Sequence, residues 1–175
     1  ADGSLGPAVF QMKTVGNVGP TNATSAPPGS FAISAHEGPD GHPHQMEADP
    51  SNEWVVGSDA GQDRIYVWRL TVGGTPPLTP AAIPFVNTPP GDGPRHFAFH
   101  PNGVWMYSIQ EEGNTIIFWQ FNPATGTLTE AQQVSSLPPG FAGTVFTSEI
   151  RVSADAGVVG GRVPRGFRAL PTMRG

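Results

Sequence analysis

The sequence predicts an all-β fold made of β-propeller blades, each a four-stranded antiparallel sheet. Three observations predict it. A segment with two tryptophans recurs along the chain, 23 glycines and 20 prolines among 175 residues place turns between short apolar runs, and the 10 Phe, 4 Trp and 2 Tyr gather in those runs. Only 13% of the residues are charged, which argues against a disordered chain. The alternative is a β-sandwich in which the tryptophan spacing arises by chance.

The repeat is visible when Pro50 is aligned with Pro101, an offset of 51 residues (101 minus 50). Without a gap, the same offset aligns three further identical pairs: Trp54 with Trp105, Ile65 with Ile116, and Trp68 with Trp119. A unit of four strands that recurs about every 50 residues is typical of a propeller blade.

Within each unit, short β-branched and aromatic runs alternate with turn-forming residues. The expected first strands are 45–48 and 96–99, the second strands 54–58 and 105–109, the third strands 64–68 and 115–119, and weaker fourth strands begin near Leu78 and near 126–128. The turns between first and second strands, 49–52 and 100–103, are rich in Pro, Asn, Ser and Gly. The pattern of each unit therefore predicts three strands joined by two turns, followed by a fourth strand.

A third unit begins at 148–152 and then departs from the pattern. Its expected second strand, Val158 and Val159, is short and runs at once into two glycines. Pro164 to Phe167 resembles Pro94 to Phe97, so we interpret it as the opening of a fourth unit after about half a blade is missing. We expect one partial propeller domain over 1–175, with blades starting near 44, 95 and 148, incomplete after 155. Its open strand edges favour self-association.

Composition narrows the possible partners. The net charge is −5 and no basic stripe with interleaved aromatics occurs, so we expect no nucleic-acid partner. The chain has no cysteine and no apolar run of ~18 residues, so we expect no cysteine metal site and no membrane partner. We predict no cofactor, and the lack of cysteines and of a signal sequence in these residues favours a cytoplasmic location.

Five polar residues receive simple interpretations. His42 and His44 flank a proline and could bind a metal, but no Asp, Glu or Cys cluster completes a familiar set, so we predict a rigid loop and no metal. His100 aligns with Asp49 at the first turn of its unit, which suggests that it caps the turn. Glu112 and Glu130 are expected to be solvated charges.

The repeat also gathers polar residues. Equivalent positions in successive blades form a ring, and first strands line the central channel, so His44, Arg95, Glu149 and Arg165 are expected at or beside one ring near one mouth. Glu111 ends the second strand beside the same mouth. Arginines bind carboxylate or phosphate, and histidine is the usual general base near neutral pH. This set predicts proton-transfer chemistry on a small anion; the alternative is hydrogen bonding from blade to blade.

Several stretches resemble a known family. Glu37 to His44 and Asn122 to Leu128 match it, and Gly93 to Gly103, with the sequence GPRHFAFHPNG, is the most specific. The chain resembles the lactonase-type seven-bladed β-propellers, which include bacterial 6-phosphogluconolactonases and a fungal carboxymuconate cyclase. The resemblance runs from about Asp2 to Asp155 and implies about three of seven blades.

The resemblance implies a hydrolase of carbohydrate metabolism, in the pentose phosphate pathway, that opens a small anionic lactone. It implies His44, Arg95, Glu111 and one further arginine as catalytic groups, with Arg162 the nearest match for the fourth. We add His96, Glu149 and Arg165 as substrate-binding candidates, and whether Arg162 or Arg165 fills the fourth position stays open. A cycloisomerase of the carboxymuconate cyclase type and a non-catalytic binding module are the alternatives.

Overall fold

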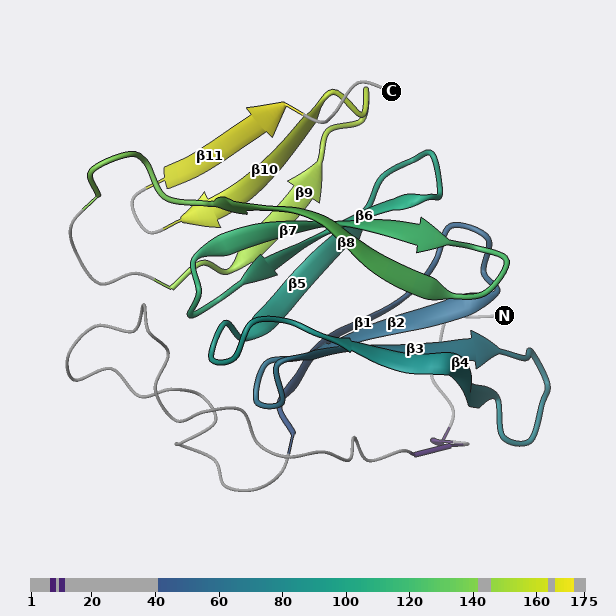
Figure 1. Cartoon of the computed structure of the whole chain (residues 1–175). Coiled ribbons are helices and arrows are strands. Elements are labelled where there is room, and N and C mark those ends of the chain that lie inside the picture. Colours follow the sequence, from purple (N-terminus) through teal and green to yellow (C-terminus); the bar gives the residue numbers. More distant parts are fainter. Residues whose placement is uncertain (1–6, 9, 12–40, 142–145, 164–165, 172–175) are drawn as a thin grey trace.

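The computed structural model describes residues 7–8, 10–11, 41–141, 146–163 and 166–171, the last two residues of 146–163 and all of 166–171 by backbone alone (Figure 1). They form three antiparallel sheets. The first contains β1 (Pro43–Ala48), β2 (Trp54–Asp59), β3 (Arg64–Leu70) and β4 (Leu78–Asn87). The second contains β5 (Pro94–Phe99), β6 (Trp105–Gln110), β7 (Thr115–Asn122) and β8 (Thr127–Ser135). The third contains β9 (Glu149–Val152), β10 (Val158–Val163) and β11 (Gly166–Pro171).

The predicted all-β propeller blades are confirmed, and the first two sheets follow the strand pattern expected from the sequence. Each sheet is ordered as its strands occur in the chain, from a first strand to a fourth. The register repeats as well, because Val55 pairs with Trp68 in the first sheet and Met106 with Trp119 in the second. The fourth strands β4 and β8 are longer than the weak signals near Leu78 and 126–128 suggested. Among the described residues, no helix is long and apolar enough to cross a membrane.

The turns between first and second strands are held by side-chain caps. Asp49 accepts hydrogen bonds from the backbone N–H groups of Ser51, Glu53 and Trp54 at 2.8–3.1 Å. At the equivalent place, Nδ1 of His100 accepts the N–H of Asn102 at 3.1 Å. The capping role predicted for His100 therefore matches the geometry.

The third sheet corrects one interpretation of the sequence. Residues 166–171 do not open a fourth unit, because β11 pairs antiparallel with β10 along its whole length, from Val158 opposite Pro171 to Val163 opposite Gly166. The strand β10 is also longer than expected, and the sheet continues past 155. Its glycines hide the apolar alternation that marks a strand, yet a Cβ on Gly161 would lie 3.0 Å from Cδ1 of Ile109. The glycine thus lets β10 approach the second sheet closely.

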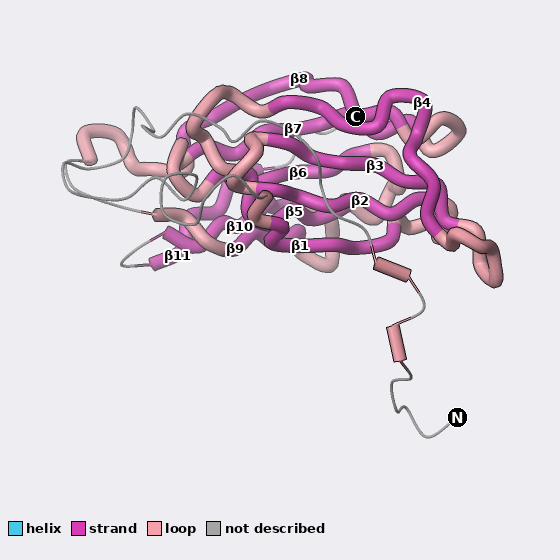
Figure 2. The backbone as a smooth tube through the Cα atoms, turned by 90° about the horizontal axis from the view of Figure 1, so that it is seen from below, coloured by secondary structure: helices cyan, strands magenta, loops and turns pink. Residues whose placement is uncertain are grey.

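The sheets stack face to face, with the first strands β1, β5 and β9 along one side and the fourth strands β4 and β8 along the opposite side (Figure 2). One apolar core, which contains Trp54 and Trp119, lies between the first and second sheets. A second core, with Tyr107 and Ile150, lies between the second and third sheets. Alternate residues of β6 and β7 enter opposite cores, as a strand buried on both faces requires.

Glu112 is buried rather than solvated, with 3% of its surface exposed. The turn that carries it packs under the linker into β5, where the carbonyl of Asp92 accepts the N–H groups of Glu112 and Gly113 at 3.1 and 3.0 Å. The linker covers the turn, which sequence spacing did not reveal. Glu130 is exposed, as predicted.

Candidate active site

Polar side chains gather where the first strands begin. His44 lies in β1, Arg95 in β5, and Glu149 starts β9, while Glu111 directly follows β6. Because β6 runs antiparallel to β5, its end lies beside the start of β5, where Pro94 pairs with Gln110. Backbone topology therefore brings these four residues to one end of the sheets, while Arg165, the remaining member of the predicted ring, lies outside the described residues.

Glu111 joins His44 and Arg95, and we call these three residues the Glu111 triplet. Its Oε2 lies 3.2 Å from Nε of Arg95 and 3.7 Å from Nε2 of His44. The contact with Arg95 is an ion pair rather than a hydrogen bond, because neither Nε of Arg95 nor Oε2 of Glu111 makes a hydrogen bond of acceptable geometry. The side chain of Glu111 is only 17% exposed. A half-buried carboxylate thus lies between a cation and an imidazole.

A second triplet lies beside the first, formed by Glu149, His96 and Arg151. Oε2 of Glu149 is 3.4 Å from Nδ1 of His96, and Oε1 is 3.3 Å from Nε of Arg151. Glu149 is 34% exposed and Arg151 81% exposed, so this Glu149 triplet is the more open of the two. Sequence reasoning missed Arg151, although its place two residues after Glu149 puts both side chains on one face of β9.

Arg95 connects the two triplets. Its guanidinium nitrogen lies 3.2 Å from Nε2 of His96 and donates a 2.7 Å hydrogen bond to the carbonyl of Ser148. On the other side, the hydroxyl of Ser58 donates a 2.6 Å bond to the backbone carbonyl of Arg95. The residue is therefore held by the first sheet through its backbone and by the third sheet segment through its side chain.

Gln45 supports the same strand. Its side-chain oxygen accepts the N–H of Phe97 at 2.9 Å, and its side-chain nitrogen donates to the carbonyl of Phe97 at 3.0 Å. The amide thus satisfies both backbone groups of one residue at the free edge of β5, two positions after Arg95. Sequence reasoning did not single out Gln45 or Ser58, because each acts through a neighbouring blade.

Burial and neighbouring charges lower the pKa values of the two histidines of the site and raise that of Glu111. Burial lowers the pKa of His44 below its usual value of 6.5, and the positive charge of Arg95 lowers it further. Burial and then Arg95 lower the pKa of His96 as well, against the pull of Glu149. Burial raises the pKa of Glu111, and this effect exceeds the opposing effect of Arg95. His44 is therefore neutral near pH 7 and able to accept a proton.

The side chains of the two remaining candidate arginines, Arg162 and Arg165, lie outside the described part of the structure. Arg162 lies in β10 with its backbone opposite Glu149, so the sheet brings this position to the site, but its side chain lies outside the described part of the chain. Arg165 lies outside the described residues altogether. Their roles stay predictions. Among the described residues, no group of three His, Asp or Glu side chains could hold a metal ion.

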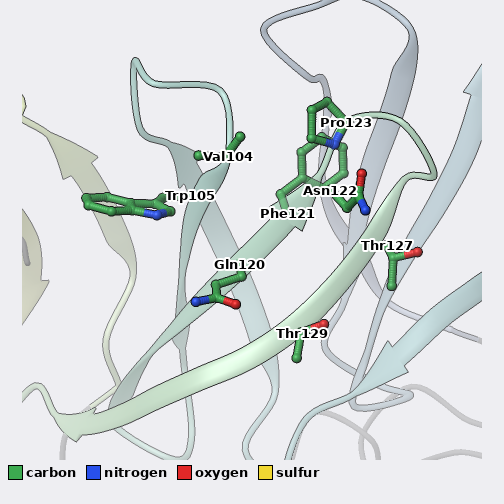
Figure 3. Close-up of a pocket in the computed structure, with 8 residues that line it drawn as sticks. All are labelled: Val104, Trp105, Gln120, Phe121, Asn122, Pro123, Thr127 and Thr129. Atoms are coloured by element: carbon green, nitrogen blue, oxygen red, sulfur yellow. The ribbon is translucent and has the colours of Figure 1, made fainter. Parts of the chain in front are cut away.

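Two grooves in the described part of the structure lie away from the triplets. One, of about 560 Å³, is lined by Trp105, Gln120, Thr127 and Thr129, with other residues of β6, β7 and β8 (Figure 3). Since β6 begins at Trp105 and ends beside Glu111, this groove is at the opposite end of the strands from the triplets. A second, of about 390 Å³, lies on the first sheet around Met46 and Leu78. Neither groove includes a residue of the triplets.

Comparisons with known proteins agree with the architecture. A family model described as "Lactonase, 7-bladed beta-propeller" matches residues 1–161. The chain is 32% identical to a 6-phosphogluconolactonase of Bacillus subtilis over 147 residues, which are 84% of this chain and 40% of that protein. It is 34% identical to the 6-phosphogluconolactonase of Erwinia tasmaniensis over 64% of this chain and 33% of that protein.

Solved structures give the same picture. A periplasmic gluconolactonase of Pseudomonas aeruginosa, PpgL, superposes with a TM-score of 0.70 at 29% identity, over 76% of this chain and 38% of that one. A putative 6-phosphogluconolactonase of Bacteroides fragilis superposes with a TM-score of 0.68 at 21% identity, over 93% and 42% of the two chains. The present chain thus spans less than half the length of these relatives.

Proposed function

The chain belongs to the family of seven-bladed β-propeller lactonases, and on this premise we propose that its Glu111 triplet serves the hydrolysis of a small anionic lactone. The observation that carries the proposal is the carboxylate of Glu111 between Nε2 of His44 and Nε of Arg95. A neutral imidazole beside a carboxylate and a guanidinium supplies a base, a group that orients it, and a cation for developing negative charge. The names of the relatives suggest a phosphorylated sugar lactone as substrate.

In the proposed reaction, His44 takes a proton from water as the water oxygen attacks the lactone carbonyl carbon. The carbonyl oxygen becomes an oxyanion, which the charge of Arg95 stabilises. The intermediate collapses, the ring C–O bond breaks, and the ring oxygen receives the proton from His44. The product is a hydroxy acid, whose carboxyl group then releases its proton to solvent. Glu111 acts by orienting His44 and by stabilising its protonated form.

Anion binding falls to the more open side of the site. Arg151 is 81% exposed and accessible to a ligand, whereas Arg95 is held between two sheets. A guanidinium binds phosphate through two parallel N–H groups, so Arg151 suits the charged end of the substrate while Arg95 suits the reacting carbonyl. His96 and Glu149 would hold hydroxyl groups between these ends. Arg162 and Arg165 are further candidates for the phosphate.

The test is hydrolysis of 6-phosphogluconolactone by the purified chain, followed as acid release above the uncatalysed rate. We expect activity in the unchanged chain, a loss of about 100-fold or more in kcat/KM for Arg95→Ala and His44→Ala, and little change for Arg69→Gln, an arginine paired with Glu53 away from the triplets. Equal rates for Arg95→Ala and Arg69→Gln would contradict the assignment.

Two further measurements separate the alternatives. Conversion of a muconolactone in place of the sugar lactone would favour a cycloisomerase, in which the same base acts on a C–H bond. Binding of either lactone without turnover would favour a binding module. Self-association through open strand edges and a cytoplasmic location both stay predictions; light scattering on a sizing column measures the first.

A further inference from the structure

Thr147 lies in the segment that leads into β9, with 0% of its surface exposed. Its hydroxyl donates a 2.6 Å hydrogen bond to the carbonyl of Gln110, the last residue of β6. Its backbone N–H donates to the carbonyl of Glu111 at 3.1 Å. A single buried residue at the entrance to the third sheet therefore holds two consecutive carbonyls of the second sheet, at the position that carries the acid of the Glu111 triplet.

The backbone of Glu111 has to place its carboxylate, because Oε2 itself makes no hydrogen bond of acceptable geometry. The N–H of Glu111 donates to the carbonyl of Gly93 at 2.8 Å, so the linker into β5 holds one side of the residue. Thr147 holds the other side. The distances from the carboxylate to Nε of Arg95 and Nε2 of His44, 3.2 and 3.7 Å, thus depend on these two backbone contacts.

The hydroxyl of Thr147 is not needed to satisfy the carbonyl of Gln110. That carbonyl also accepts the N–H of Asn114 at 3.0 Å, in the turn between β6 and β7, and one donor is enough for a buried carbonyl. A threonine side chain is stiff at χ1, so its hydroxyl points in a restricted direction. The main contribution of this bond is therefore the relative position of β6 and the segment before β9.

The two residues after Thr147 contact other members of the site. The carbonyl of Ser148 accepts the 2.7 Å hydrogen bond from the guanidinium of Arg95, and Oε2 of Glu149 lies 3.4 Å from Nδ1 of His96. Three consecutive residues, 147–149, thus contact both triplets. The place of this segment relative to β6 bears on the whole site, and the hydroxyl of Thr147 joins the segment to the end of β6.

We propose that Thr147 is a positioning residue for the Glu111 triplet: its buried hydroxyl fixes the end of β6 against the third sheet and so sets the place of the Glu111 carboxylate beside His44 and Arg95. Thr147 acts through Glu111, since it is buried and bonds to backbone groups. Its effect on turnover rests on the proposed function, whereas its effect on the charge of His44 rests on the geometry alone. The two effects are measured separately.

Thr147→Val tests the proposal, because it removes the hydroxyl, keeps the branched side chain, and leaves the carbonyl of Gln110 bonded to Asn114. The full chain is labelled with nitrogen-15 histidine, and the resonances that disappear in His44→Gln identify His44 for an NMR titration. We expect the titration midpoint of His44 to fall by roughly 0.5 pH units, because an anion that moves away no longer favours the charged imidazole. Thr147→Ser keeps the hydroxyl and should restore the midpoint.

The other charges that act on His44 are held by bonds that do not involve Thr147. Burial lowers the pKa of His44 most, and neighbouring groups act as well: Arg95, His96 and His42 lower it, and Asp59 raises it. Oδ1 of Asp59 accepts the backbone N–H of His42. Arg95 is held by His96 through its guanidinium and by Ser58 through its carbonyl. A change in the midpoint therefore reports mainly on Glu111.

Ser136→Ala is the matched control. Ser136 is also fully buried, and its hydroxyl donates a 2.8 Å hydrogen bond to the carbonyl of Asn114, at the far end of the same turn. This variant loses a buried bond of the same kind, so the His44 midpoint should stay in place. In lactone hydrolysis, Thr147→Val should lower kcat about tenfold with little change in KM, while Thr147→Ser and Ser136→Ala stay within about twofold of the unchanged chain.

The outcomes separate this proposal from the proposed function. If the chain hydrolyses the lactone and Thr147→Val matches Ser136→Ala in midpoint and in kcat, the proposal is overturned while the function stands. If the chain does not hydrolyse the lactone, the proposed function fails, and the His44 midpoint alone supports or overturns the role of Thr147. Thr147→Ala, with the same expected results, replaces Thr147→Val if that variant does not fold.

Discussion

The two interfaces between sheets have the same register and differ in completeness. At the first interface, between the first and second sheets, Trp54 is 6% exposed and its indole N–H is bonded. At the second interface, between the second and third sheets, Trp105 is only partly buried and borders a groove. The difference teaches that the repeat determines which face of a strand meets the next sheet, while a separate contact, the turn between β7 and β8, covers that face at Trp54.

The candidate site divides along the same line. The Glu111 triplet bridges the first interface, since His44 belongs to the first sheet and Arg95 to the second. The Glu149 triplet bridges the second interface, from His96 to Glu149 and Arg151. The side chain of Glu111 is 17% exposed and that of Glu149 is 34% exposed. Acid-base chemistry therefore fits the tighter interface, and substrate binding the more open one.

The largest expected difference is in stability. Trp54→Ala should lower the free energy of unfolding by about 3–5 kcal/mol, because it empties a sealed core position, and Trp105→Ala by roughly half as much. Urea denaturation of both variants measures this. Equal losses would mean that the groove beside Trp105 does not weaken the second interface.

The next difference concerns catalysis and rests on the proposed function. Glu111→Gln should lower kcat/KM for lactone hydrolysis by about 100-fold, because His44 loses the charge that stabilises its protonated form. Glu149→Gln should lower it by about tenfold or less, mainly through KM. If Glu149→Gln has the larger effect on kcat, the roles of the two triplets are reversed. Since burial and Arg95 lower the pKa of His44, activity should still be substantial just below pH 6.5.

A smaller effect is expected from the bridge between β1 and β5. Gln45→Ala removes both hydrogen bonds to Phe97 and should lower the free energy of unfolding by about 1–3 kcal/mol. Gln132→Ala, an exposed glutamine on β8, is the matched control and should change little. Chemical denaturation of the two variants gives the comparison. If Gln45→Ala leaves the free energy of unfolding unchanged, the two hydrogen bonds of Gln45 do not stabilise the first interface.

The smallest expected effect is a pH dependence of the free energy of unfolding that arises from Asp92, in the linker into β5. Burial raises the pKa of Asp92 from 3.8 to about 6. The folded state therefore binds a proton more tightly than the unfolded state, and the stabilisation present below pH 3.8 is lost as the pH rises through about 6. Asp92→Asn should remove this loss, with a gain of about 1 kcal/mol at pH 7 after discounting for solvent exposure, and no gain near pH 3.5.

Thermal melts at a series of pH values measure this effect. Glu130→Gln, an exposed carboxylate on β8, serves as the control and should follow the unchanged protein. A gain for Asp92→Asn that is equal at all pH values would show that titration of Asp92 is not its cause.

Much of this arrangement followed from the sequence. The repeat predicted the strands of the first two sheets and placed His44 and Arg95 on one ring of equivalent positions, with Glu111 beside it at the end of a second strand. It did not reveal β11 as a third strand, since the glycines before it remove the apolar alternation that marks a strand. It also missed the burial of Glu112 under a linker and the contact of Arg151 with Glu149. The burial of Glu112 depends on how a neighbouring segment covers it, which spacing along one chain does not encode. The contact of Arg151 with Glu149, in contrast, follows from their spacing of two residues along one strand.

The contact of Trp54 with the turn between β7 and β8 also has a consequence for the order of folding during synthesis. The hydrogen bond from its indole to the carbonyl of Pro123 joins residues 69 positions apart, and Gly126, which packs against the ring, lies further still along the chain. When the ribosome has completed the first sheet, the indole N–H has no carbonyl to bond, and one face of the ring is bare. We therefore expect the first sheet to finish folding only after the outer hairpin of the second sheet has emerged from the ribosome.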